Sequence, residues 1–213
     1  MDGESLAAVI RDAQRGDPKA FDALADLYAG RIFGFVYRLT GSRHDAEDLM
    51  QEVFLRVVRT IERYKHDGRF EPWIFRIAAN LVRDRVRRVK RSPRRAAPAD
   101  PRGDESSASD MLDGFPTRQR TVEDALVCSE DIAEMNAALA TLPEGEREVL
   151  MLRHFSQMTF KEIAELMETP LGTALARAHR GLSRLREAMT GASATKQPGG
   201  AVKIDARPVA GEA

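Results

Sequence analysis

The sequence has few residues of the kinds that build disulfide frameworks, thiolate metal sites or membrane spans. Its 213 residues include one cysteine, which excludes a disulfide framework and a zinc site made of several thiolates. Aromatic residues make up only 6%, and no apolar run approaches the roughly 18–20 residues that span a bilayer. The first residues lack the basic-then-apolar layout of a secretory signal. We therefore predict a cytoplasmic protein without membrane insertion.

The sequence motifs of common active sites are missing as well. There is no glycine-rich phosphate loop, no His-Glu-x-x-His motif and no serine nucleophile elbow. The four histidines are scattered along the chain rather than spaced as metal ligands. We therefore predict that the protein is not an enzyme and has no catalytic residue, no metal and no cofactor.

The charges are numerous and unevenly placed. Lys+Arg and Asp+Glu number 33 each, so the formal net charge is zero. Residues 76–95 nevertheless contain nine basic residues and one acid, whereas residues 121–150 contain eight acids and one base. A basic block beside an acidic one indicates a polyanionic partner for the first and a different role for the second.

The hydrophobic periodicity predicts helices throughout the first 91 residues. A helix is expected from Pro18 to Thr40, capped by Asp17 and ended by Gly41, because these residue types favour helix ends. A second helix begins near Ser42 and carries an apolar stripe at helical spacing, and a third runs from Pro72 to about Arg91.

The helical pattern is interrupted once and then resumes. Residues 92–120 are rich in Pro, Ala, Asp, Ser and Gly without an apolar face, which predicts a flexible linker between separately folded units. Residues 121–190 again read as helices, and residues 191–213 as a disordered tail. The predicted fold class is all-α, with two small helical domains at residues 1–91 and 121–190.

Residues 159–186 have the pattern of a helix-turn-helix. Thr159 and Glu162 fit a capping box, which is followed by a short helix, a turn near Thr169-Pro170 and a longer helix. Arg177, Arg180 and Arg184 share one face of that longer helix, as guanidinium groups in a DNA major groove would require. A plain helical hairpin with a solvated basic face is the alternative.

Two further surfaces carry functional signals. The basic run from Arg83 to Arg91 has almost no compensating acid and follows aromatic residues on which single-stranded bases could stack: Tyr64, His66, Phe70 and Trp73. For each aromatic residue taken singly, a place in the helical core is the stronger reading. Asp48, Gln51 and Glu52 share a polar helix face. Without further information, an ordinary solvated face explains those three residues equally well.

These motifs together resemble the bacterial extracytoplasmic-function (ECF) RNA polymerase sigma factors of the sigma-70 family. DAEDLMQEVF (45–54) and WIFRIAAN (73–80) resemble two segments of sigma region 2. The Leu142-Pro143 step, residues 147–150 and the helix-turn-helix resemble region 4. The two regions follow one another in the family's order.

The resemblance implies an alternative sigma factor that directs promoter-specific transcription initiation. Region 2 would dock on the β′ clamp helices of core RNA polymerase through Asp45, Asp48, Gln51 and Glu52. It would melt and hold the minus-ten element through Tyr64, His66, Trp73, Asn80, Arg83, Arg87 and Arg88. Region 4 would contact the polymerase β flap and read minus-35 duplex DNA through Thr173, Leu175, Ala176, Arg177, His179, Arg180 and Arg184. An anti-sigma factor is a further implied partner.

The sequence departs from the family at the centre of the helix-turn-helix. Glu168 stands where the turn often has glycine, and Leu175 and Ala176 stand where many members have polar groups. Their apolar side chains could meet thymine methyl groups instead.

Competing functions are a one-component regulator that binds DNA as a dimer, a helical adaptor without a DNA role and, last, a nuclease.

Overall fold

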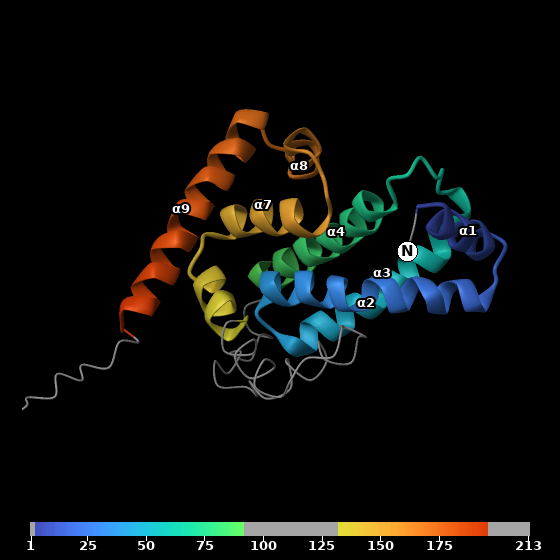
Figure 1. Cartoon of the computed structure of the whole chain (residues 1–213), viewed down its shortest axis with the longest axis horizontal. Coiled ribbons are helices and arrows are strands. Elements are labelled where there is room, and N and C mark those ends of the chain that lie inside the picture. The colour runs from blue at the N-terminus through green and yellow to red at the C-terminus, as the bar shows by residue number, and fades with distance from the viewer. Residues whose placement is uncertain (1–2, 92–131, 196–213) are drawn as a thin grey trace, which may run out of the picture.

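The computed structural model describes residues 3–91 and 132–195 (Figure 1). Regular secondary structure in these two ranges consists of helices alone, which confirms the predicted all-α fold of two helical domains. The predicted linker, the start of the second unit and the chain beyond residue 195 lie outside the described residues. No helix within the described ranges is long and apolar enough to cross a bilayer.

The N-terminal domain consists of four helices and a short 3₁₀ turn. Their bounds are α1 Gly3–Gln14, α2 Pro18–Thr40, α3 Arg43–Thr60, η1 Ile61–Arg63 and α4 Phe70–Arg91. The predicted caps are present: the Asp17 carboxylate accepts a hydrogen bond from the Lys19 backbone N–H, and Gly41 adopts a left-handed φ of 69°. The Ser42 side chain caps α3, so local sequence sets the three helix ends as expected.

The core of the N-terminal domain fills the space enclosed by α2, α3 and α4. Phe35 and Phe75 are fully buried, and their rings meet edge to face with centroids 5.3 Å apart. The predicted stripe of α3 is buried at Val53 and Val57. Burial of large apolar side chains of this kind contributes about 1.5–3 kcal/mol each, so packing rather than local propensity holds these helices together.

The C-terminal domain comprises helical residues 132–140, α7 Glu144–Phe155, α8 Phe160–Leu166 and α9 Leu171–Thr195. The Thr159–Glu162 capping box is present at the start of α8. Glu168 in the turn has a φ of 52°, the left-handed conformation that costs a non-glycine residue roughly 1–2 kcal/mol. The α9 helix continues through residues 191–195, which the sequence assigned to a disordered tail.

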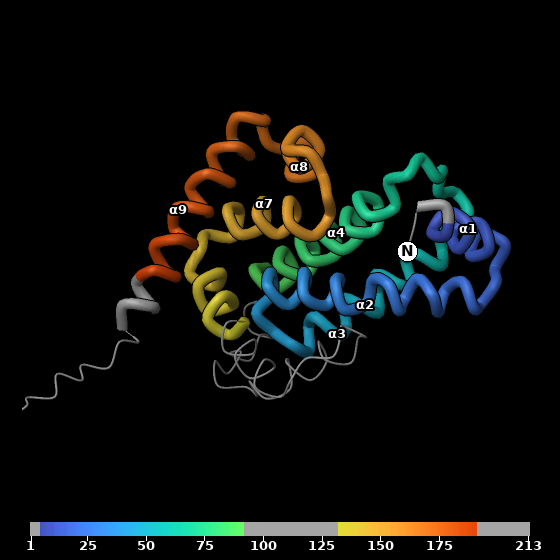
Figure 2. Tube along the Cα trace, in the orientation of Figure 1, coloured from blue at the N-terminus to red at the C-terminus, as the bar shows by residue number. Residues whose placement is uncertain are grey.

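The two domains pack against each other. In Figure 2, α7 lies across α2 and α4, and both pairs of helices are in contact. The ring of Phe155, at the end of α7, has its centroid 5.9 Å from that of Phe35 and 6.1 Å from that of Phe75. One buried apolar cluster therefore runs through both domains, whereas the sequence suggested separately folded units. Phe155 was not recognised as an interdomain contact because its partners are about 80–120 residues away in the chain.

Candidate nucleic-acid interface

The basic residues of α4 fall into two groups. Arg76, Arg87 and Arg88 are exposed and form no ion pair within the described part of the chain. Arg85 and Arg83 are held by carboxylates: an Arg85 guanidinium nitrogen lies 2.5 Å from Asp45 Oδ1, and Arg83 Nε lies 2.6 Å from Glu148 Oε1. The first group is available to phosphates, and the second is already neutralised within the protein.

A hollow lies beside this basic run, between α3 and α4. Its volume is about 270 Å³, and its lining combines aromatic, amide and charged side chains: Arg56, Thr60, Trp73, Ile77, Asn80, Leu81 and Asp84. Trp73 is half-buried and Asn80 is exposed. An indole face with an adjacent amide offers stacking and hydrogen bonding to an unstacked base.

The remaining aromatic residues pack around Trp73. The Tyr64 ring lies 4.7 Å from the Trp73 ring and 5.5 Å from the Phe70 ring, centroid to centroid. Phe70 is buried and belongs to the core, as the alternative reading of the sequence had it. His66 is exposed, with its ring 6.0 Å from that of Tyr64. Burial and the nearby Asp67 carboxylate raise the pKa of the Tyr64 phenol to about 12, so the phenol remains neutral at physiological pH.

The sequence predicts that the arginines of α9 form an exposed basic face, but the structure places their side chains differently. Arg180 Nε lies 3.1 Å and an Arg184 guanidinium nitrogen 2.7 Å from the carboxylate of Glu146, a buried α7 residue. The half-buried Arg177 covers Gly145: an added β-carbon there would lie 3.3 Å from the Arg177 guanidinium carbon. All three side chains therefore reach toward α7, because the acids of α7 attract them.

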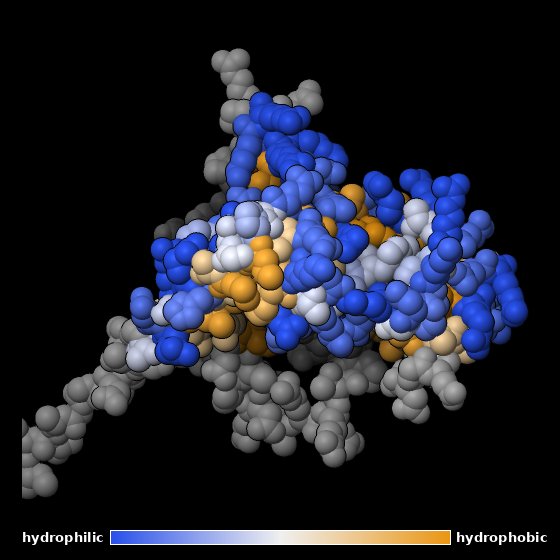
Figure 3. Space-filling view, turned by 90° about the horizontal axis from the view of Figure 1, so that it is seen from above, coloured by the Kyte–Doolittle hydropathy of each residue, from blue (hydrophilic) through white to orange (hydrophobic). Residues whose placement is uncertain are grey.

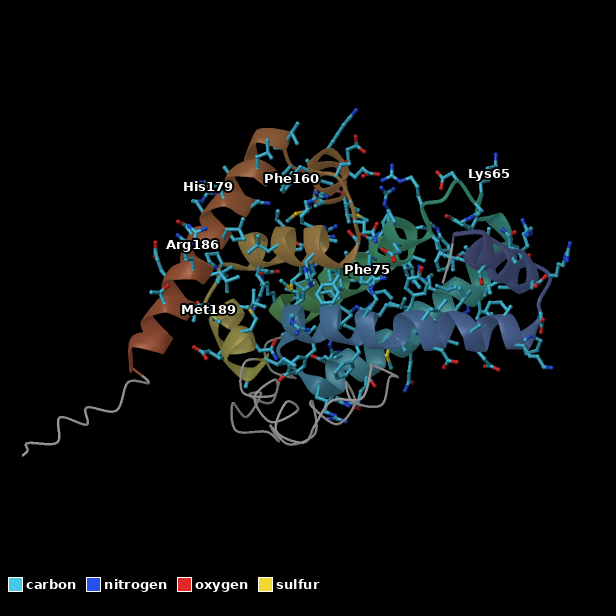
Figure 4. All side chains as sticks on the ribbon, in the orientation of Figure 1. Lys65, Phe75, Phe160, His179, Arg186 and Met189 are labelled. Atoms are coloured by element: carbon cyan, nitrogen blue, oxygen red, sulfur yellow. The ribbon has the colours of Figure 1, made fainter. Side chains whose placement is uncertain are left out.

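The face of α9 turned away from α7 carries other residues. Leu175 and His179 are exposed, whereas Thr173 and Ala176 are half-buried. In Figure 4, His179 and Arg186 lie on the outer side of α9. The structure thus brings two of the predicted minus-35 residues, Leu175 and His179, to the outer face and places the three arginines at its edge.

The polar face of α3 is open to solvent. Asp48 and Gln51 are exposed, and the Glu52 side chain is 40% exposed. Their charged neighbours within the described residues are local: Asp48 lies 3.5 Å from His44 Nε2, and Glu52 pairs with Arg56 at 3.8 Å. Leu55 and Val58 continue this face with about half of their surface exposed. The sequence reading missed these two residues, although their spacing from Gln51 (i+4 and i+7) was the available signal.

The comparisons with known proteins decide the family. The model of Sigma-70 region 2 matches residues 24–92, and the model of Sigma-70 region 4 matches residues 132–185. The chain is an ECF sigma factor of the sigma-70 family. Region 2 thus falls on the N-terminal domain and region 4 on the C-terminal domain.

Individual relatives agree with this assignment. ECF RNA polymerase sigma factor SigW of Bacillus subtilis is 33% identical over 84% of this chain and 93% of its own length. ECF RNA polymerase sigma factor SigE of Mycolicibacterium smegmatis is 35% identical over 86% of this chain and 68% of its own. The fold resembles the sigma factor RpoE of Bartonella quintana, solved with the anti-sigma factor NepR. That structure has a TM-score of 0.58 and 22% identity, and the match covers 81% of this chain and 98% of that one.

An apolar groove of about 820 Å³ opens on region 4 of this sigma factor. It lies between α7, α9 and helical residues 132–140, and Arg38 of α2 also lines it. Its apolar lining includes Leu139, Leu150, Phe155, Phe160, Leu182 and Leu185. In Figure 3, apolar residues gather on this half of the molecule within a charged border. Leu182 is 54% exposed. Exposed apolar surface with a polar rim is typical of a protein-binding site.

Asp45 differs from the other residues assigned to polymerase binding. It lies in the first turn of α3, where a negative charge is favoured by the helix dipole. Its carboxylate is 20% exposed and is bound to Arg85. The local role of Asp45 is therefore to fix the start of α3 against α4, whereas Asp48, Gln51 and Glu52 project outward.

Proposed function

We propose that this chain joins core RNA polymerase as an alternative sigma factor and directs initiation by holding promoter DNA at two places. The observation that carries the proposal is the presence, in one chain, of both sigma regions with polar and charged groups exposed at their surfaces. These groups are the polar face of α3, the free cations of α4 and the outer face of α9. A dimeric one-component regulator would not need the α3 face, and the family membership speaks against it.

Region 2 would bind the β′ clamp helices of the polymerase through the outer face of α3. Asp48, Gln51 and Glu52 supply hydrogen-bond acceptors and negative charge. Leu55 and Val58 add apolar area that a partner would remove from water. Region 4 would meet the β flap, so that the two DNA-binding surfaces are held on one enzyme.

The minus-ten element would be held as single-stranded DNA beside α4. Arg87 and Arg88 would bind its phosphates, and the hollow lined by Trp73 and Asn80 would accept an unstacked base. Unstacking a base costs a few kcal/mol, which stacking worth about 1–3 kcal/mol per base offsets. Tyr64 and His66, beside Trp73, would extend the stacking surface.

The minus-35 element would be read as duplex DNA by the N-terminal half of α9. Leu175 and Ala176 suit thymine methyl groups, whereas Thr173 and His179 can form hydrogen bonds with base edges or phosphates. Arg180 and Arg184 remain about half exposed beside Glu146. They would therefore reach the DNA backbone at the edge of the groove.

An anti-sigma factor is the proposed regulator, and the apolar groove of region 4 is its proposed binding site. Two solved structures of similar fold contain a bound partner: CnrH with the cytosolic domain of CnrY, and the sigma factor RpoE with the anti-sigma factor NepR. The chain would act in the cytoplasm, where the polymerase is, and would leave all catalysis to the polymerase. Replacing Leu182 by Glu should abolish co-purification of the partner from the native host. Recovery of wild-type chain free of any partner would contradict this part of the proposal.

The main test is reconstitution with core RNA polymerase. The wild-type chain should give run-off transcripts from a promoter library of its host, and the Asp48→Lys, Glu52→Lys double variant should give none because it no longer binds the polymerase. Asp22→Lys, Asp26→Lys is the matched control, since these exposed α2 acids have the same spacing and make no ion pair within the described ranges. Polymerase binding by the α3 variant equal to that of the control would refute the assignment of this face.

A further inference from the structure

The contact between the two domains has opposite charges on its two sides. Arg83, on α4, pairs with Glu148, on α7, and their side chains are only 18% and 13% exposed. A second Arg83 nitrogen donates a hydrogen bond of 2.7 Å to the backbone oxygen of Leu166, at the end of α8. The region-2 side supplies the cation, and the region-4 side supplies these two partners; a longer hydrogen bond of 3.4 Å runs from Arg83 to Asn80 Oδ1 on α4 itself.

Two further ion pairs repeat this division. Lys90 Nζ, near the end of α4, lies 2.6 Å from Glu144 Oε2 at the start of α7. Arg69, just before α4, pairs with Glu162 of α8. In each pair the basic residue belongs to region 2 and the acid to region 4. The basic and acidic blocks of the sequence therefore meet at this contact.

The geometry matches one row of cations to one row of acids. Arg83, Arg87 and Lys90 are spaced by four and three residues and share a face of α4, whereas Glu144 and Glu148 are spaced by four on α7. A carboxylate binds a guanidinium or ammonium group through the same charge-assisted hydrogen bonds as a phosphate. The acids of α7 thus bind two α4 cations, Arg83 and Lys90, that could otherwise bind phosphates.

The packing of the two domains affects the two proposed DNA-binding surfaces differently. Arg83 cannot reach a nucleic acid while it is enclosed by Glu148 and the end of α8. Arg87 and Arg88 stay exposed, and so does the outer face of α9. The packed arrangement therefore withholds part of the single-strand surface of region 2 and leaves the duplex-reading surface of region 4 open.

The charged part of the contact between the domains is incompletely paired and partly exposed to solvent. The third guanidinium nitrogen of Arg83 is buried without a hydrogen-bond partner, and the Lys90–Glu144 pair is 64% and 52% exposed. Exposed ion pairs are weak and are screened by salt. The partly buried Phe155 adds an apolar contact on α2 and α4, and its backbone oxygen accepts a hydrogen bond of 2.7 Å from Arg31. The charged part of the contact is therefore the part on which a competing polyanion would act.

We propose that the acidic face of region 4, Glu144 and Glu148 on α7, acts as an internal competitor for nucleic acid and holds the free chain closed over α4. This inference rests on the proposed function, because it takes α4 as the surface that binds single-stranded DNA. Opening is then a step that precedes promoter melting. Region 4 has two roles: it reads duplex DNA, and in the free chain it masks region 2.

The first experiment captures the closed state chemically. Within the described residues, Lys90–Glu144 is the only ion pair that contains a lysine, so a zero-length carbodiimide should couple these two side chains in the free full-length chain. Mass spectrometry should find the 90–144 cross-link in the wild type and not in the Lys90→Arg variant. The cross-linked chain should bind a 20-nucleotide single-stranded DNA at least fivefold more weakly than the uncoupled chain. Absence of the cross-link, or equal DNA affinity of the coupled chain, would overturn the proposal.

The second experiment removes the competitor. The Glu144→Gln, Glu148→Gln variant should bind the same DNA about five- to tenfold more tightly than the wild type, because the cost of opening is removed. The control, Glu165→Gln, Glu187→Gln, removes the same charge from two exposed residues that make no side-chain ion pair within the described chain. Equal affinities of variant and control would refute the internal competition.

Transcription separates failure of this inference from failure of the proposed function. If the wild-type chain supports run-off transcription with core polymerase while the glutamine variant and the control bind DNA equally, only the masking role is wrong. If the wild-type chain supports no transcription at all, the proposed function itself fails. Circular dichroism of the glutamine variant excludes misfolding as the cause of any change.

Discussion

The helices α4 and α9 both carry the arginines expected to bind DNA, but they place them in opposite surroundings. On α4, Arg87 and Arg88 extend into solvent without an ion pair among the described residues. On α9, Arg180 and Arg184 converge on the buried carboxylate of Glu146. The spacing of basic residues looks alike in the two segments, yet the nearest acid decides how much of each charge is free.

This difference shows how one residue type serves two purposes in this sigma factor. Under the proposed function, the free arginines on α4 would bind phosphates, with an affinity that depends on salt. The arginines bound to Glu146 join α9 to α7 and so orient the outer face of α9. We therefore expect substitutions of the free arginines Arg87 and Arg88 to affect DNA binding without changing stability, and substitutions at the Glu146 cluster to affect stability first.

Loss of the free α4 cations should have the largest effect. The Arg87→Ala, Arg88→Ala variant should lower the affinity of the polymerase complex for promoter DNA about 100-fold, at roughly 1.5 kcal/mol per lost charged hydrogen bond. The slope of log affinity against log salt should fall by about 2, while thermal unfolding of the free chain stays unchanged. An unaltered salt slope would place the phosphate contacts elsewhere.

Removal of the Glu146 charge should have the second-largest effect. Glu146→Gln leaves Arg180 and Arg184 without their buried partner, and because both remain half exposed to water, the loss should be about 2 kcal/mol, below the range for fully buried pairs. Urea unfolding of this variant and of Glu165→Gln, the exposed control, measures the difference. Equal unfolding midpoints would mean that the cluster does not orient α9.

Acid should weaken the start of α8. Although partial burial acts to raise it, the pKa of Glu162 is lowered to about 2 by hydrogen bonds from Thr159 and by Arg69. A depressed folded-state pKa means that the stabilisation is fully present above the ordinary value of 4.5 and is lost as the pH falls toward 2. Glu162→Gln should cost about 1 kcal/mol at pH 7, with a smaller cost at pH 2.5. A cost that does not change with pH would contradict the assigned charge state.

Two glycines of α9 should give the smallest effects, of opposite sign. An alanine β-carbon at Gly172 would meet no atom within 4 Å, so Gly172→Ala should stabilise the chain by about 0.5 kcal/mol through helix propensity. At Gly181 the same carbon would lie 3.0 Å from Leu150 Cδ1 and 3.3 Å from Glu146 Cβ. Gly181→Ala should therefore cost about 1 kcal/mol. Stabilisation by both substitutions would show that α7 and α9 pack loosely at the Glu146 cluster.

Much of the local structure was predictable because its causes are local. Asp17, Gly41 and the Thr159–Glu162 capping box end or begin helices through contacts within four residues. Glu168 stands where the turn often has glycine, and its φ of 52° shows that the turn keeps a left-handed conformation at this position. Membership in the sigma-70 family was equally readable, since the motifs of both regions are contiguous in the sequence. The roles of individual DNA-binding and polymerase-binding residues remain predictions.

The sequence by itself determined that this chain is all-helical, that it carries two sigma regions, and which residues begin and end most of its helices. Only the tertiary structure decided which charges are free: it paired Arg83 with Glu148, Arg180 and Arg184 with Glu146, and set Phe155 between α2 and α4. The physical reason is the separation along the chain over which each interaction acts. Caps and periodicity act over a few residues, whereas an ion pair between positions 83 and 148 depends on how two domains pack, which no short stretch of sequence encodes.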